Sequence, residues 1–148
     1  MCSSDLSPVR RAEVCRFPGS SRRNFRSRVE KPPSGPQWLH EVKLDGYRMA
    51  ARIDQGRVQL LTRTGLDWSD KYPSAIAALA DVKAKTAYID GELCGVDAAG
   101  LPSFANTRAA TDGERKVRLV YYAFDLLNLD GRDVSGLPLI ERKGYLSR

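Results

Sequence analysis

Apolar and polar residues alternate along much of the chain after Gln37. Such alternation is typical of strands that bury one face, because successive side chains of a strand point to opposite sides. Val, Tyr, Phe and Leu, which are common in strands, dominate the last of these segments. The predicted strands are residues 38–45, 47–53, 58–62, 88–96 and 117–126. Turn-forming residues follow three of them, so hairpins should connect neighbouring strands.

Helical spacing of apolar residues is clear in one segment. From Pro73 to Val82, Ile76 and Leu79 recur at helical spacing in an alanine-rich stretch that begins with proline. Residues 101–118 follow neither pattern, so the sequence leaves the structure of that connection open. Strands outnumber helices, which predicts an α+β fold built on antiparallel sheet.

The first 36 residues differ from the rest of the chain. They are rich in Ser, Arg and Pro, lack periodicity and end in the sequence Pro-Pro-Ser-Gly-Pro. Such a segment cannot bury enough apolar surface to order itself, so we predict a disordered basic leader at residues 1–36 and a folded domain at residues 37–148. The leader holds eight of the 24 basic residues and three of the 18 acidic ones. It would either add salt-sensitive phosphate affinity or be a solvated tail.

Composition limits the classes of protein that fit. No run approaches the roughly 18 apolar residues of a membrane helix, and no secretory signal opens the chain. The cysteines, Cys2, Cys15 and Cys94, are odd in number and match no metal-site spacing, which favours reduced thiols in a cytoplasm. His40 is the only histidine, which excludes most histidine-based zinc and triad chemistry, and we expect it to be structural.

Two polar clusters are candidates for chemistry. Glu41 and Lys43 would share a strand face just before Gly46, and Arg48 follows on the next strand. A lysine beside a metal or other cations can become a nucleophile. The alternative is a surface strand with mixed charges.

The second cluster is Asp90 and Glu92, which would share a face opposite Ile89 and Leu93. Paired carboxylates repel each other unless a cation lies between them, so these two residues are candidate metal ligands. The alternative for Asp-Gly-Glu is an ordinary turn.

The motif Lys43-x-Asp45-Gly46-x-Arg48 resembles the signature of the covalent nucleotidyltransferases, which comprise DNA ligases, RNA ligases and mRNA-capping enzymes. Three further segments resemble later family elements in the same order: residues 62–65, 90–92 and 122–127. The flanking residues are similar to bacterial end-joining ligases of the ligase D type. Residues 37–146 therefore resemble the N-terminal portion of an ATP-dependent DNA ligase adenylation domain, an antiparallel-sheet-rich, ATP-grasp-like nucleotidyltransferase fold that is incomplete here.

The resemblance implies a role for each matching residue. Lys43 would attack the α-phosphorus of ATP and hold AMP through a P–N bond. Glu41 and the Val42 backbone would contact the adenine, and Phe124 would stack on it. Arg48 and Arg63 would contact phosphate or ribose. Glu92 would supply a ribose- or metal-facing carboxylate, with Asp90 beside it. Lys43 should then lie in one pocket with Glu92 and Phe124.

The same resemblance implies cofactors and partners. ATP and Mg²⁺ (or Mn²⁺) would be the cofactors, and nicked or broken duplex DNA the substrate. End-joining proteins would be further partners, no membrane would be involved, and the location would be the bacterial cytoplasm at the nucleoid.

Two later family elements are missing before Arg148: a Glu followed by Gly-x-Val-x-Lys, and a Lys-x-Lys pair. The DNA-clamping OB-fold domain is missing too. Because catalysis depends on holding the reactants in place, we expect this chain to be a weakly active or inactive fragment. The alternatives are an RNA ligase or capping-type nucleotidyltransferase, and a non-enzymatic basic nucleic-acid-binding module.

Overall fold

The computed structural model describes residues 34–36 and 38–147. The sheet and helices belong to one compact unit, Glu41–Arg148. The predicted leader lies outside the described residues except for residues 34–36, and so does the predicted boundary at Gln37. None of the helices in the described part of the chain has the length and hydropathy of a membrane span.

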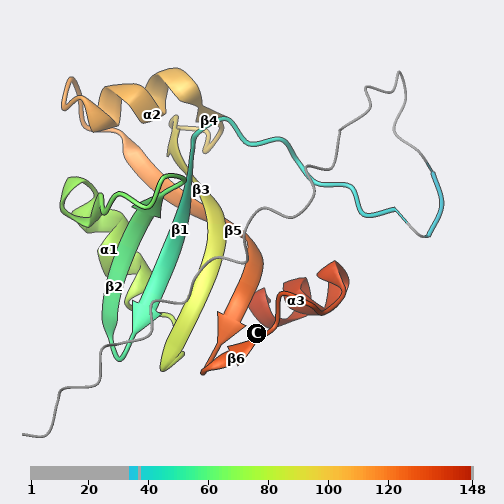
Figure 1. Ribbon diagram of the computed structural model, residues 1–148. Helices are drawn as coiled ribbons and strands as arrows, with labels where there is room; N and C mark the ends of the chain where they lie inside the picture. The colour runs from blue at the N-terminus through green and yellow to red at the C-terminus, as the bar shows by residue number, and fades with distance from the viewer. Residues whose placement is uncertain (1–33, 37, 148) are drawn as a thin grey trace, which may run out of the picture. The chain divides into compact units, whose positions relative to one another are not determined.

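An antiparallel six-stranded sheet is the centre of the fold (Figure 1). The strand order is β2-β1-β3-β5-β6, and the short strand β4 pairs with β3. The strands are β1 (Tyr47–Asp54), β2 (Arg57–Thr62), β3 (Thr86–Val96), β4 (Pro102–Ser103), β5 (Arg118–Leu129) and β6 (Arg132–Asp133). The predicted α+β class is confirmed, as are four of the five predicted strands.

Three α-helices and one 3-10 turn accompany the sheet in the described residues. They are η1 (Ser69–Lys71), α1 (Pro73–Leu79), α2 (Phe104–Thr111) and α3 (Leu139–Leu146). In Figure 1, α2 lies near the end of β3 that carries β4, and α3 lies beside β5. The predicted helix at residues 73–82 is confirmed in a shorter form, whereas the sequence did not predict α2 or α3.

Helix α2 forms in the segment that the sequence left open. The Ser103 side chain caps it by accepting a hydrogen bond from Asn106 N at 3.1 Å. Thr107 is fully buried, and its hydroxyl accepts a hydrogen bond from Gly95 N at 2.9 Å. The helix therefore depends on a cap and on a contact with β3, neither of which produces apolar periodicity.

The period-two pattern of β1 separates a core face from a polar face. Met49, Ala51 and Ile53 are buried, whereas Arg48 and Arg52, which point to the other face, are exposed. The buried face packs with Ile89 and Leu93 of β3 and with α1 and its flanking aromatic residues. Removing these apolar side chains from water supplies most of the driving force for folding. The opposite face of the sheet remains available for polar groups.

The predicted strand at residues 38–45 is wrong. These residues form no strand, and β1 begins at Tyr47, opposite Leu93 of β3. Farther along the same edge of β3, Gly95 pairs with Ser103 and Val96 with Pro102, so β4 occupies the positions that an extended β1 would need. The alternating pattern is compatible with a strand, but β3 offers this segment no unpaired strand edge.

Close packing through Gly91 fixes the middle of β3. A Cβ atom there would lie 2.4 Å from the Tyr121 ring. The Tyr121 hydroxyl lies 3.0 Å from both the Met49 and the Ile89 carbonyl oxygens, to which it can donate. Burial raises the pKa of this phenol. The aromatic ring therefore packs across three strands, directly over the Asp-Gly-Glu segment.

We expect Gly91→Ala to lower the free energy of unfolding by about 1–3 kcal/mol, because the added methyl overlaps the Tyr121 ring. Urea denaturation of the purified protein measures this change. Gly136→Ala is the matched control, since a Cβ there meets no atom within 4 Å and the backbone φ is not positive. Equal stability of the two variants would contradict the packing constraint.

Candidate active site

The polar face of the sheet brings together four of the predicted site residues. Strand register places Arg48 of β1 directly opposite Glu92 of β3, and Ala50 opposite Asp90. Phe124 lies in β5, where the pairing with β3 shifts register between Asp90 and Gly91. Such irregularities redirect side chains, and they are frequent beside active sites. Arg48 Cζ lies 5.6 Å from the centroid of the Phe124 ring, so both residues reach the same face.

Arg48 and Asp90 form a bidentate ion pair. The guanidinium donates from Nε to Asp90 Oδ1 at 3.1 Å and from Nη2 to Asp90 Oδ2 at 2.5 Å. The hydrogen bond to Asp90 is the largest cause of the raised pKa of Arg48, although partial burial opposes it. This geometry fixes the direction of the guanidinium. It also occupies both oxygens of Asp90.

Gly46 connects the lysine motif to Glu92. Its amide donates to Glu92 Oε1 at 3.1 Å. A Cβ atom at this position would lie 2.4 Å from the Leu93 carbonyl oxygen and 2.6 Å from Cys94 Sγ. Glycine is therefore required here by close approach to β3 rather than by a positive φ angle. This hydrogen bond places the backbone that follows Lys43 beside the Glu92 carboxylate of β3.

The Lys43 side chain itself is not enclosed. It is 89% exposed, and its Nζ lies 3.5 Å from Asp45 Oδ1. Val42 and Arg63 are exposed as well, the latter at the tip of the turn that closes β2. Within the described residues, no hydrogen bond or ion pair joins Lys43 or Arg63 to Glu92 or Phe124. The Lys43 side chain is open to solvent here, and a common pocket for Lys43, Glu92 and Phe124 stays a prediction.

Helix α3 adds two residues to which the sequence assigned no role. Arg142 donates to both oxygens of Asp125, at 2.7 and 2.9 Å, and it also bonds the Ser135 and Leu137 carbonyl oxygens. Lys143 Nζ lies 2.8 Å from the Phe124 carbonyl oxygen and 2.5 Å from Glu41 Oε1. Both residues lie in a stretch that resembles the end-joining ligases, which was the one sequence signal that pointed to them.

The carboxylates of this face would fit a divalent cation only together with a phosphate ligand. No group of three or more His, Cys, Asp or Glu residues is placed to hold a metal in the described part of the chain. Both Asp90 oxygens already bind Arg48, and Glu92 Oε1 accepts from Gly46. Mg²⁺ in nucleotide enzymes is commonly held by one or two carboxylates, substrate phosphates and water. Glu92 can serve as such a carboxylate.

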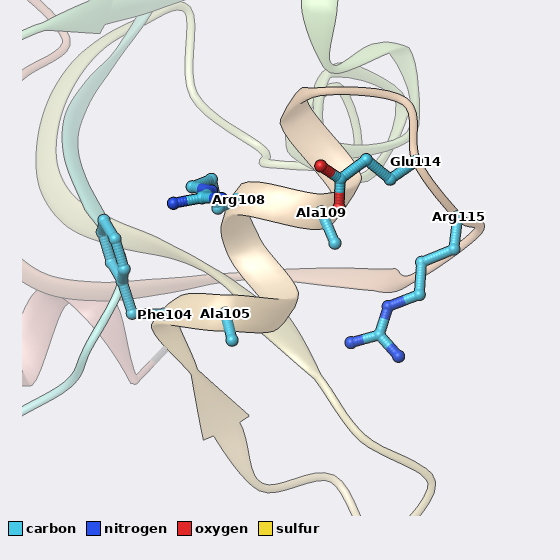
Figure 2. A pocket seen from close by; sticks show the side chains of 6 residues that line it. All are labelled: Phe104, Ala105, Arg108, Ala109, Glu114 and Arg115. Atoms are coloured by element: carbon cyan, nitrogen blue, oxygen red, sulfur yellow. The ribbon is translucent and has the colours of Figure 1, made fainter.

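Two surface hollows lie elsewhere in the described residues. One, of about 410 Å³, is lined by side chains of α2 and the residues after it: Phe104, Ala105, Arg108, Ala109, Glu114 and Arg115 (Figure 2). The other, of about 590 Å³, lies between β2 and α1 and includes Arg57, Asp67 and Ile76. Neither includes a predicted site residue, so the candidate site is a surface on the sheet rather than one of these hollows.

Comparison with known proteins decides the family. The family model described as "ATP dependent DNA ligase domain" matches residues 22–148. The chain belongs to this family. The predicted resemblance to ATP-dependent DNA ligases is thereby confirmed, and the sheet of Figure 1 is a ligase-domain sheet.

Several relatives of this ligase domain are named as end-joining proteins. It is 41% identical over 120 residues to the multifunctional non-homologous end joining protein LigD of Pseudomonas aeruginosa, which covers 81% of this chain and 14% of that protein. It is 37% identical over 110 residues to LigD of Mycobacterium tuberculosis strain H37Rv, covering 74% of this chain and 14% of that protein. The chain thus spans a small part of the relatives that it matches.

Solved ligase structures have the same fold. The ligase domain of M. tuberculosis LigD matches with a TM-score of 0.63 and 37% identity, over 72% of this chain and 35% of that one. A mycobacterial DNA ligase D complexed with ATP and MES matches with a TM-score of 0.63 and 35% identity, over the same shares. The predicted antiparallel nucleotidyltransferase fold is confirmed.

The buried Cys94 thiol gives this face a measurable pH dependence. Desolvation, with a smaller effect of Glu92, raises its pKa from 9.0 to about 11. The unfolded chain therefore ionises first, and between about pH 9 and 11 the free energy of unfolding should fall as pH rises.

We expect this slope in urea titrations of a Cys2→Ser/Cys15→Ser variant, and a shallower slope after a further Cys94→Ala substitution. Tyrosines are common to both proteins, so the difference isolates the thiol. Iodoacetamide should label Cys94 slowly in the folded variant and rapidly in urea. Fast labelling of the folded protein at pH 8 would show that the thiol is not buried.

Proposed function

We propose that this chain is the AMP-accepting portion of an ATP-dependent DNA ligase of the end-joining type, with Lys43 as the residue that becomes linked to AMP. One observation carries the proposal. In a chain of the ligase domain family, Gly46 of the lysine motif bonds to Glu92, and Glu92 lies opposite Arg48 on the face that also holds Phe124.

The proposed reaction forms one bond and breaks one. The uncharged ε-amine of Lys43 attacks the α-phosphorus of ATP, a P–N bond forms, and pyrophosphate leaves with the electrons of the P–O bond. The amine must first lose a proton to solvent. Lys43 lies outside the sheet and is exposed, so it can approach a bound nucleotide without disturbing any strand pair.

The residues around Lys43 would bind the parts of the nucleotide. Arg48 and Arg63 supply cations for phosphate or ribose oxygens, where negative charge develops during the transfer. Phe124 supplies an aromatic face for adenine, and such stacking contributes roughly 1–3 kcal/mol in other base–aromatic contacts. Glu41 and the Val42 backbone would border the base.

Mg²⁺ (or Mn²⁺), when bound, would neutralise charge on the phosphate oxygens. We propose Glu92 as its carboxylate ligand, because one Glu92 oxygen remains after the bond to Gly46. Each Asp90 oxygen already accepts one hydrogen bond from Arg48. We therefore propose that Asp90 acts chiefly by orienting Arg48.

Nicked or broken duplex DNA is the proposed substrate, and end-joining proteins in the bacterial cytoplasm are the proposed partners. The names and ligands of similar proteins support this: several are end-joining proteins called LigD, others are named as probable DNA ligases, and one solved structure is a complex with ATP. The chain covers 14% of those LigD proteins, so the activity of a whole ligase would require parts beyond the residues matched here.

Covalent labelling with α-³²P-ATP and Mg²⁺ tests the proposal. We expect weak or no labelling of the 148-residue chain by itself. A chimera in which residues 37–148 replace their counterpart in P. aeruginosa LigD, at 41% identity, should become labelled. Lys43→Ala in this chimera should abolish labelling, because no other side chain can form the P–N bond at that position.

Lys83→Ala is the matched control, since Lys83 is also an exposed lysine but lies outside the candidate site. It should leave labelling unchanged. Labelling that survives Lys43→Ala would end the assignment of the nucleophile. Labelling by GTP in preference to ATP would favour a capping-type enzyme, and sealing of nicked RNA in preference to DNA would favour an RNA ligase.

A further inference from the structure

Helix α3 is fixed firmly to β5 by its arginine. The Arg142–Asp125 pair has two hydrogen bonds, and its side chains are only 14% and 20% exposed. Two further bonds join Arg142 to the carbonyl oxygens of Ser135 and Leu137, in the loop that leads into the helix. A planar guanidinium held at this many points has little freedom. The backbone position of the next residue of the helix, Lys143, is therefore well defined.

Lys143 joins two parts of the candidate site that are far apart in the sequence. Its ammonium group contacts the backbone carbonyl of Phe124, at the register shift of β5, and the carboxylate of Glu41, two residues before Lys43. The Lys143 side chain is 25% exposed, whereas that of Glu41 is 49% exposed. An exposed ion pair contributes little to stability. This one instead holds the segment before Gly46 beside the aromatic residue of the sheet.

The contact between Lys143 and Glu41 matters because adenine and guanine differ in the hydrogen-bonding groups at their edges. The exocyclic amino group of adenine is a hydrogen-bond donor, whereas guanine presents a carbonyl acceptor at the same position. Lys143 engages Oε1 of Glu41, which leaves Oε2 to accept from an amino group. A carboxylate held in this way would favour adenine and repel the oxygen of guanine.

We propose that Lys143 is a positioning residue that holds Glu41 beside Phe124 and thereby sets the preference of the site for adenine over guanine. This inference rests on the proposed function, in which Glu41 and Phe124 border the base. Lys143 itself need not touch the nucleotide. Its effect would pass through the orientation of Glu41 and the backbone of Phe124.

Amide hydrogen exchange of the full 148-residue chain, without nucleotide, tests the positioning. Lys143→Met keeps the length of the side chain and removes its charge. We expect exchange in a peptide covering residues 41–48 to become about two- to fivefold faster, because a partly exposed ion pair contributes up to about 1 kcal/mol. Lys116→Met, at an exposed lysine outside the candidate site, should leave that exchange unchanged. Unchanged exchange in Lys143→Met would overturn the inference.

Binding of ribose-labelled fluorescent ATP and GTP to the chain and to the chimera, with and without substitutions at Lys143, tests specificity. We expect Lys143→Met to reduce the preference for ATP over GTP about tenfold, and Lys143→Arg to restore most of it. A parallel loss of both affinities would indicate a merely structural role and overturn the specificity claim. If the unsubstituted chain and the unsubstituted chimera bind neither nucleotide, the proposed function itself fails, and the specificity role of Lys143 fails with it.

Discussion

The pairing of β3 along both edges is the constraint on which the rest of the structure depends. β1 pairs with it from Thr86 to Leu93 and β5 from Ala87 to Val96, so residues from three distant parts of the sequence lie in rows across one sheet. One such row contains Arg48, Glu92 and Tyr122. A shift of one residue in either pairing would turn Arg48 or Glu92 into the core. The chemistry of the polar face is therefore fixed by the packing of the apolar face.

Close packing at two glycines, Gly91 and Gly46, holds the motifs of the polar face in place. At Gly91 the Tyr121 ring occupies the space of a side chain, and at Gly46 the Leu93 carbonyl and Cys94 do so. Each glycine lies within a motif that carries charged residues, Asp-Gly-Glu in one case and Lys-x-Asp-Gly in the other. Close approach allows the Gly46 amide to satisfy Glu92, so the lysine motif is held to the sheet by its backbone.

The charges of the polar face are arranged in pairs with different roles. Arg48 is directed by Asp90, whereas Arg142 and Asp125 fix a helix and leave Lys143 to reach Glu41. Lys43 differs from these residues, because its segment has no strand partner and its side chain faces solvent. A nucleophile that must meet a ligand can be placed on such a segment, while the groups that bind the ligand remain on the rigid sheet.

The sequence by itself determined the class of fold, four strands, helix α1 and the order of the motif residues, because alternation, helical spacing and turn residues are local signals. Tertiary structure alone decided three other points. Residues 38–45 stay unpaired because β4 takes the edge of β3, Asp90 binds Arg48 with both oxygens, and α3 brings Lys143 to Glu41. Each point depends on which distant groups the fold places side by side, and no local pattern encodes that. Local periodicity can assign a residue to a face, but only the folded chain assigns it a partner.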